Sequence, residues 1–61
     1  MTQINIDVKN EGRVFTFEFG KKGLKISENQ REDFFYLTLS VQHELLEIAR
    51  NILKESHNIY I

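Results

Sequence analysis

With 61 residues the chain has room for one domain, which we expect to span residues 1–61, and folding removes only about 60% of the unfolded surface of so short a chain. The sequence has no cysteine, which excludes disulfides and thiolate metal sites, so we expect a homodimer to supplement the small core. Eight Lys and Arg residues against nine Asp and Glu residues give a net charge of −1, which argues against a general polyanion binder.

The N-terminal residues, Met1 to Asp7, do not contain a basic patch followed by an apolar run, so we expect no secretory signal. No window of the sequence is long and apolar enough to predict a membrane span. We therefore predict a cytoplasmic protein without a membrane partner.

Alternating apolar residues predict strands at residues 3–9 and 14–19. Directly opposed residues on paired strands point to the same side, so only a loop with an even number of residues brings both apolar faces together. Gly12 in this loop is expected at positive φ. The register then gives these apolar pairs: Val8 with Phe15, Ile6 with Phe17, and Ile4 with Phe19.

Glycines at both ends of Gly20-Lys21-Lys22-Gly23 predict a second even-length turn and a third strand at about residues 24–28. This turn pairs Phe19 with Leu24 and Phe17 with Ile26. A polar connector, residues 29–32, then leads to a fourth strand at residues 34–39. The fourth strand is expected to contribute these residues to the core: Phe35, Leu37 and Leu39.

Apolar residues then recur at three- and four-residue steps, which predicts a helix from Val41 to about Ser56. Ser40 is the expected N-cap, and Asn58 lies where the helix is expected to end. The predicted buried stripe consists of Val41, Leu45, Ile48, Ala49 and Ile52. The fold class is therefore α+β: a four-stranded antiparallel β-meander followed by one C-terminal helix packed on one sheet face (ββββα).

Leu46 and Leu53 lie seven residues apart on the flank of this stripe. Two interpretations stay open. Either they overhang the sheet and form, with Tyr60 and Ile61, an apolar surface for a partner, or the twisted sheet reaches under them. The hydrophobic tail 59–61 is expected to dock on the core edge, extend the sheet or reach a neighbour.

A single helix cannot cover both faces of a four-stranded sheet, and strand parity places aromatic and basic residues on the uncovered face. Exposed rings beside lysines can stack unpaired bases while the lysines contact phosphates. The alternative is a dimer interface or cross-strand packing, which we favour because Asp7 and Glu18 share this face and repel phosphate. The residues in question are Phe34, Tyr36, Lys9 and Lys25.

The segment Leu37-Thr38-Leu39-Ser40 runs into the helix at the end of the predicted meander. This topology resembles that of positive-cofactor-type transcriptional coactivators and their bacterial relatives. The resemblance implies a dimer that holds single-stranded nucleic acid. It is architectural, so it assigns no binding residue in this chain.

The sequence contains no pattern typical of catalysis or of a metal site. His43 and Glu47 lie four apart on the solvated side of the helix without a third ligand nearby. The acidic residues Glu28, Glu32 and Asp33 match no calcium loop. We therefore expect no enzymatic activity, no cofactor and no metal.

These observations predict a small non-enzymatic protein-binding module, adaptor- or inhibitor-like, that acts as a homodimer. The alternative is single-stranded nucleic-acid binding on the open sheet face. Small proteins of phages and mobile elements act as adaptors or inhibitors, and the length of the chain suggests that origin. The residues expected to contact a partner are Phe34, Tyr36, Lys25, Lys9, Leu46, Leu53 and Tyr60.

Overall fold

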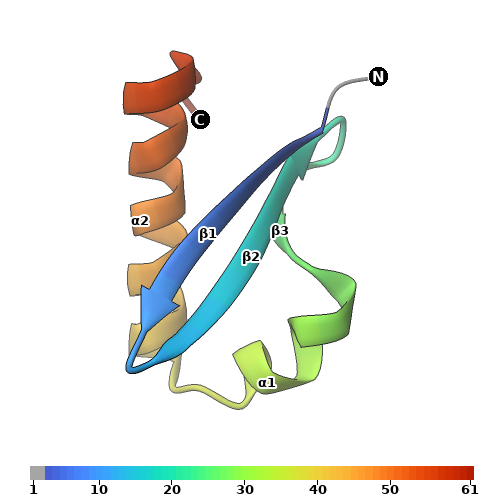
Figure 1. The fold of residues 1–61 in the computed structure, drawn as a ribbon, viewed down its shortest axis with the longest axis vertical. Coiled ribbons are helices and arrows are strands. Elements are labelled where there is room, and N and C mark those ends of the chain that lie inside the picture. The colour runs from blue at the N-terminus through green and yellow to red at the C-terminus, as the bar shows by residue number, and fades with distance from the viewer. Residues whose placement is uncertain (1–2) are drawn as a thin grey trace.

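The computed structural model describes residues 3–61 and shows an α+β fold with a three-stranded antiparallel sheet and one long C-terminal helix (Figure 1). The strand order is β1-β2-β3, and α2 runs alongside the sheet and packs against β1. The elements in chain order are β1 (Ile4–Asn10), β2 (Arg13–Gly20), β3 (Gly23–Ile26), a 3-10 turn η1 (Glu28–Gln30), α1 (Arg31–Phe35) and α2 (Leu39–His57).

The predicted registers of the first three strands are confirmed. Ile6 pairs with Phe17 in the first hairpin, and Phe17 pairs with Ile26 in the second. Glu11 and Gly12 form the first loop with φ of 48° and 84°, the left-handed pair that a tight hairpin turn between right-twisted strands requires. The alternation of apolar residues was therefore sufficient to predict an even number of residues in both loops, because a one-residue slip would have exposed the phenylalanines.

The predicted fourth strand is wrong. Residues 31–35 form the short helix α1, and residues 36–38 connect it to α2. Phe34, expected on the uncovered face, is only 2% exposed, whereas Phe35, expected in the core, is 55% exposed. Leu39, also expected in the core, is 71% exposed, and Leu37 is partly buried against the core.

Packing of one aromatic ring explains why this segment is helical. The Phe34 ring lies edge-on to Phe15 and Phe17, with centroid distances of 6.0 Å and 5.5 Å. These are favourable geometries for aromatic pairs, whose ring edges are positive and faces negative. Phe34 and Leu37 are three residues apart, a helical spacing, and both pack on the core. The ring of Phe34 thus covers the sheet in place of the core-facing side chains expected from a fourth strand.

The side chain of Gln30 takes the place of a neighbouring strand where β3 ends. Its Oε1 accepts a hydrogen bond from Thr16 N–H at 2.7 Å, and its Nε2 donates to the Val14 carbonyl at 2.7 Å. The last bond between the main chains is donated by Ser27 N–H to the Thr16 carbonyl at 2.9 Å. The Gln30 side chain therefore satisfies main-chain hydrogen-bonding groups of β2 that lie beyond the end of β3.

The N-terminal end of α2 differs from the prediction. Thr38, not Ser40, is the N-cap, and its hydroxyl accepts from Val41 N–H at 3.4 Å. The C-terminal prediction is confirmed, since Asn58 caps the helix in the left-handed conformation with φ of 57°. The main chain of Ile59 then donates to the Leu53 carbonyl at 3.0 Å, and Ile59 packs against the core edge.

The buried face of α2 is rotated from the predicted stripe. Ile48, expected near its centre, is 39% exposed, and Gln42 is buried instead. The Gln42 amide donates to the carbonyls of Leu37 at 2.8 Å and Phe35 at 3.4 Å, so the polar group is satisfied inside the connection between the helices. The residues of α2 that are buried are Gln42, Leu45, Ala49 and Leu53.

Candidate functional site

The uncovered face of the sheet is polar in the structure. Lys9 and Lys25 are exposed there, as predicted, but neither aromatic residue lies on it. Phe34 is in the core, and Tyr36 is 93% exposed at the corner between α1 and α2. On the same face Thr16 Oγ1 donates to Asp7 Oδ1 at 2.9 Å. The base-stacking surface expected from strand parity is therefore not formed by these strands.

The two leucines on the flank of α2 have different environments. Leu53 is 0% exposed, so for this residue the structure agrees with the interpretation in which the rest of the fold packs beneath it, and not with an outer surface. Leu46 is partly buried and lines a groove beside β3. Tyr60 is 70% exposed, with Lys54 Nζ 5.6 Å from the centre of its ring. Leu46 and Tyr60 thus lie on separate surfaces.

A groove beside β3 is lined by several apolar side chains. It has a volume of about 410 Å³ and lies between β3, α1 and the first half of α2. We call it the β3 groove. Its apolar lining consists of Leu24, Ile26, Phe34, Phe35 and Leu46.

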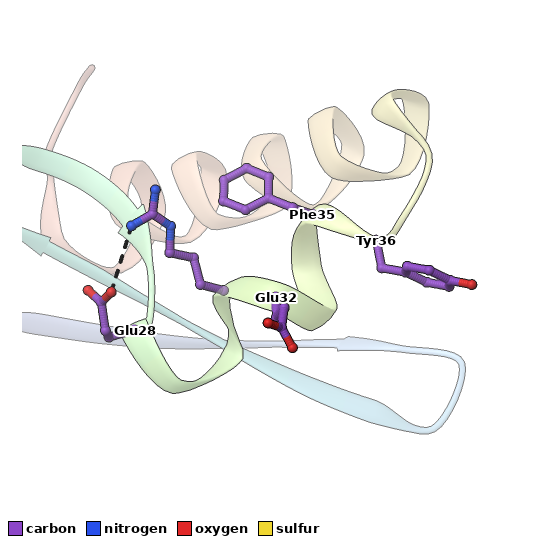
Figure 2. A pocket seen from close by; sticks show the side chains of 5 residues that line it. Glu28, Glu32, Phe35 and Tyr36 are labelled. Carbon is purple, nitrogen blue, oxygen red and sulfur yellow. Dashed lines mark ion pairs between the residues drawn. The ribbon is translucent and has the colours of Figure 1, made fainter.

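Phe35 and Tyr36 extend in different directions from the end of α1 (Figure 2). Phe35 forms a wall of the β3 groove, whereas Tyr36 does not line it. Phe35, Tyr36 and Glu32 also border a shallower hollow of about 490 Å³ on the outer side of α1. The two hollows share three lining residues: Glu28, Arg31 and Phe35.

Charged and polar side chains surround the β3 groove. Lys25 projects from β3, and Arg31 from α1 lies 3.7 Å from Glu28 in an exposed ion pair. The guanidinium of Arg31 is 5.7 Å from the centre of the Phe35 ring. Two further lysines, Lys21 and Lys22, lie in the turn that precedes β3.

The main chain of β3 offers hydrogen-bonding groups next to the groove. β3 is an edge strand, and the bond from Ser27 N–H to Thr16 fixes which of its residues pair with β2. By the alternation of an antiparallel ladder, the N–H and C=O groups of Leu24 and Ile26 point away from β2. Among the described residues, none hydrogen-bonds to these outward groups.

Of the residues that line the groove, sequence reasoning named Leu46, Phe34 and Lys25 as partner contacts but missed Leu24, Ile26 and Phe35. Leu24, Ile26 and Phe35 were all placed in a core that a fourth strand would have covered. The helical spacing of Phe34 and Leu37 could have indicated α1. The same segment, however, is rich in aromatic residues and alternates apolar with polar residues, a pattern typical of strands.

Within residues 3–61 no cluster of three or more His, Asp or Glu side chains is arranged to hold a metal ion. In the same range no helix has the length and apolarity needed to cross a bilayer. No protein-family model, curated protein or solved structure matches this chain. Its function must therefore be inferred from the geometry of its own residues.

Proposed function

We propose that this chain is a protein-binding module that captures an extended segment of another protein along the outer edge of β3. The observation that supports this function is the combination of an unpaired strand edge with an apolar groove at its side. Peptides that add a strand to a sheet gain affinity from main-chain hydrogen bonds and specificity from alternate side chains placed in pockets.

The hydrogen-bonding part of the site is supplied by Leu24 and Ile26. Their outward N–H and C=O groups accommodate a strand of three to five residues, since β3 itself has four residues. Every second side chain of the bound segment then points to the same side of the sheet as the groove. A Leu, Ile or Phe side chain inserted between Phe35 and Leu46 would be removed from water, which contributes about 1.5–3 kcal/mol.

The charges around the groove define the flanking residues of the partner. Lys21 and Lys22 lie in the turn before β3 and Lys25 lies within β3, while Arg31 is already paired with Glu28. An acidic residue next to the apolar anchor therefore complements this surface, and a basic residue opposes it. The partner we propose is an extended apolar segment with acidic flanks.

Selection from a random peptide library displayed on phage tests this proposal. Enriched peptides are expected to combine alternate apolar residues with Asp or Glu, and to lose binding about tenfold or more to the variant Leu46→Glu. The matched control is Val14→Glu, because Val14 is 42% exposed on β2 and does not line the groove. The proposal is wrong if no peptide is enriched, or if both variants bind the selected peptides as well as the parent protein.

Binding of single-stranded nucleic acid gains no further support. Its expected stacking residues were Phe34 and Tyr36, and they do not share a surface. The lysines Lys9 and Lys25 stand on a face that also contains Asp7 and Glu18. Retention of the protein on single-stranded DNA, with a steep dependence on salt, would nevertheless favour that function over peptide capture.

A further inference from the structure

The outer edge of β1 is the longest unpaired strand edge in residues 3–61. β1 has seven residues in continuous register with β2, so no bulge interrupts it, and the sequence has no proline. Natural sheets protect such edges by bulges, prolines, coverage or suitably placed charges, because an open edge pairs with other chains. Gln30 covers the free stretch of β2, whereas within residues 3–61 no side chain or strand hydrogen-bonds along the outer edge of β1 in a comparable way.

The hairpin register determines which groups β1 presents. The residues next to a two-residue loop form a hydrogen-bonded pair, here Asn10 with Arg13, and such pairs then alternate along the strands. The N–H and C=O groups of Asn5, Asp7 and Lys9 therefore point outward. Their side chains are exposed and lie on the uncovered face of the sheet.

We propose that two copies of this chain pair through their β1 edges, antiparallel, with Val8 opposite Val8 of the second copy at the two-fold axis. In this register Asp7 of each copy lies directly opposite Lys9 of the other. The edge is therefore self-complementary in charge, and two cross-strand ion pairs form by symmetry. The product is one continuous sheet built from two three-stranded sheets.

The competing symmetric registers have no such pairs. Moving the axis to Asp7 would place the two Asp7 carboxylates directly opposite each other, which is unfavourable. Moving it to Ile6 would place Asp7 opposite Asn5, which leaves the charge of both Asp7 and Lys9 uncompensated. Charge complementarity thus selects the register centred on Val8.

The position of α2 agrees with this interface. Gln42, His43 and Leu46 line the β3 groove, so this flank of α2 faces β3, and the opposite flank lies on the β1 side. That opposite flank is apolar: Val41 and Ile52 are partly buried, and Ile48 is 39% exposed. A two-fold axis perpendicular to the sheet keeps both helices on the same face, with these flanks toward the axis. The β3 groove stays open in each copy, so the dimer does not depend on the proposed peptide binding.

Charge exchange tests the register in solution by sedimentation at tens of micromolar protein. We expect the parent chain to be a dimer, and Asp7→Lys or Lys9→Asp to weaken it by about tenfold or more, because each converts both attractive pairs into repulsive ones. An equimolar mixture of the two variants is expected to form a heterodimer. The double variant D7K/K9D is expected to restore the homodimer, which shows that a loss in the single variants is not a failure to fold.

Three results would overturn the proposal. A parent chain that sediments as a monomer at these concentrations excludes the dimer. Single variants that dimerise like the parent place the contact elsewhere, including at the β3 groove. If mixing the variants gives no heterodimer while the double variant also stays monomeric, the register centred on Val8 is wrong.

Discussion

The two outer edges of the sheet present the same main-chain chemistry but different side chains. The β1 edge has seven residues, with acidic, basic and amide side chains at its outward positions, and an apolar flank of α2 beside it. The β3 edge has four residues and lies beside the β3 groove. Side chains decide which chain an open edge accepts, so we expect the β1 edge to favour a second copy and the β3 edge an apolar segment.

Residues 27–38 create this difference. They supply Gln30 to the edge of β2, Phe34 to the core and Phe35 to the wall of the groove. Arg13, at the start of β2, also holds α1 through an ion pair of 2.8 Å with Asp33. The segment thus closes part of the sheet next to β3, while the β1 edge has no comparable cover among the described residues.

The largest expected effect comes from removing the ring that seals the core beneath the β3 groove. Phe34→Ala should lower the free energy of unfolding by about 3–5 kcal/mol, because it leaves a cavity beside Phe15 and Phe17. Phe35→Ala is the matched control, since this neighbouring ring is 55% exposed, and it should cost less than about 1 kcal/mol. Urea unfolding measures both. Equal losses, or a larger loss for Phe35→Ala, would contradict the burial of Phe34 and favour the predicted fourth strand, in which Phe35 faces the core.

An intermediate effect is expected at the closed stretch of β2. Gln30→Ala removes two hydrogen bonds of 2.7 Å from Thr16 N–H and the Val14 carbonyl, which should cost about 1–2 kcal/mol. It should also speed aggregation, because it opens a further strand edge. Glu32→Ala, at an exposed position on α1, is the control for both readouts. Unchanged stability and unchanged light scattering would show that Gln30 does not seal this edge.

The smallest effect is expected for the ion pair between Arg13 of β2 and Asp33 of α1. Both side chains of the Arg13–Asp33 pair are about half exposed, at 56% and 53%, so solvent screens the pair and we expect a coupling of only about 0.2–1 kcal/mol. A double-mutant cycle with Arg13→Gln and Asp33→Asn measures the coupling separately from the contact of Arg13 with the Phe15 ring. The coupling should vanish at about 1 M salt. A salt-independent coupling would show that the pair is more strongly desolvated than its exposure indicates.

The sequence was sufficient for the parts of the fold that depend on local periodicity. Parity fixed the pairing of Ile6 with Phe17 and of Phe17 with Ile26, and the left-handed preference of Asn placed the end of α2 at Asn58. These features depend on neighbours within one hairpin or one helical turn. Long-range packing was not needed to predict them.

The segment after β3 depended on long-range packing. Phe34, Phe35 and Tyr36 are adjacent aromatic residues, and the sequence alone does not reveal which ring enters the core. Gln42 was likewise absent from the predicted buried stripe, although it is buried and its amide donates to carbonyls in the connection to α1. The groove was missed for the same reason, because it lies where the sequence predicted a fourth strand.

Amide hydrogen exchange followed by NMR, at low and high protein concentration, tests the difference between the two edges most directly. At high concentration we expect the N–H groups of Asp7 and Lys9 to become protected, while Asn5 stays unprotected because the register centred on Val8 leaves it beyond the paired segment. Leu24 and Ile26 should exchange rapidly at both concentrations and become protected only when a selected peptide is added. Rapid exchange of Asp7 and Lys9 at every concentration, or protection of Leu24 and Ile26 without peptide, would contradict the assignment of the β1 edge to a second copy and the β3 edge to a partner.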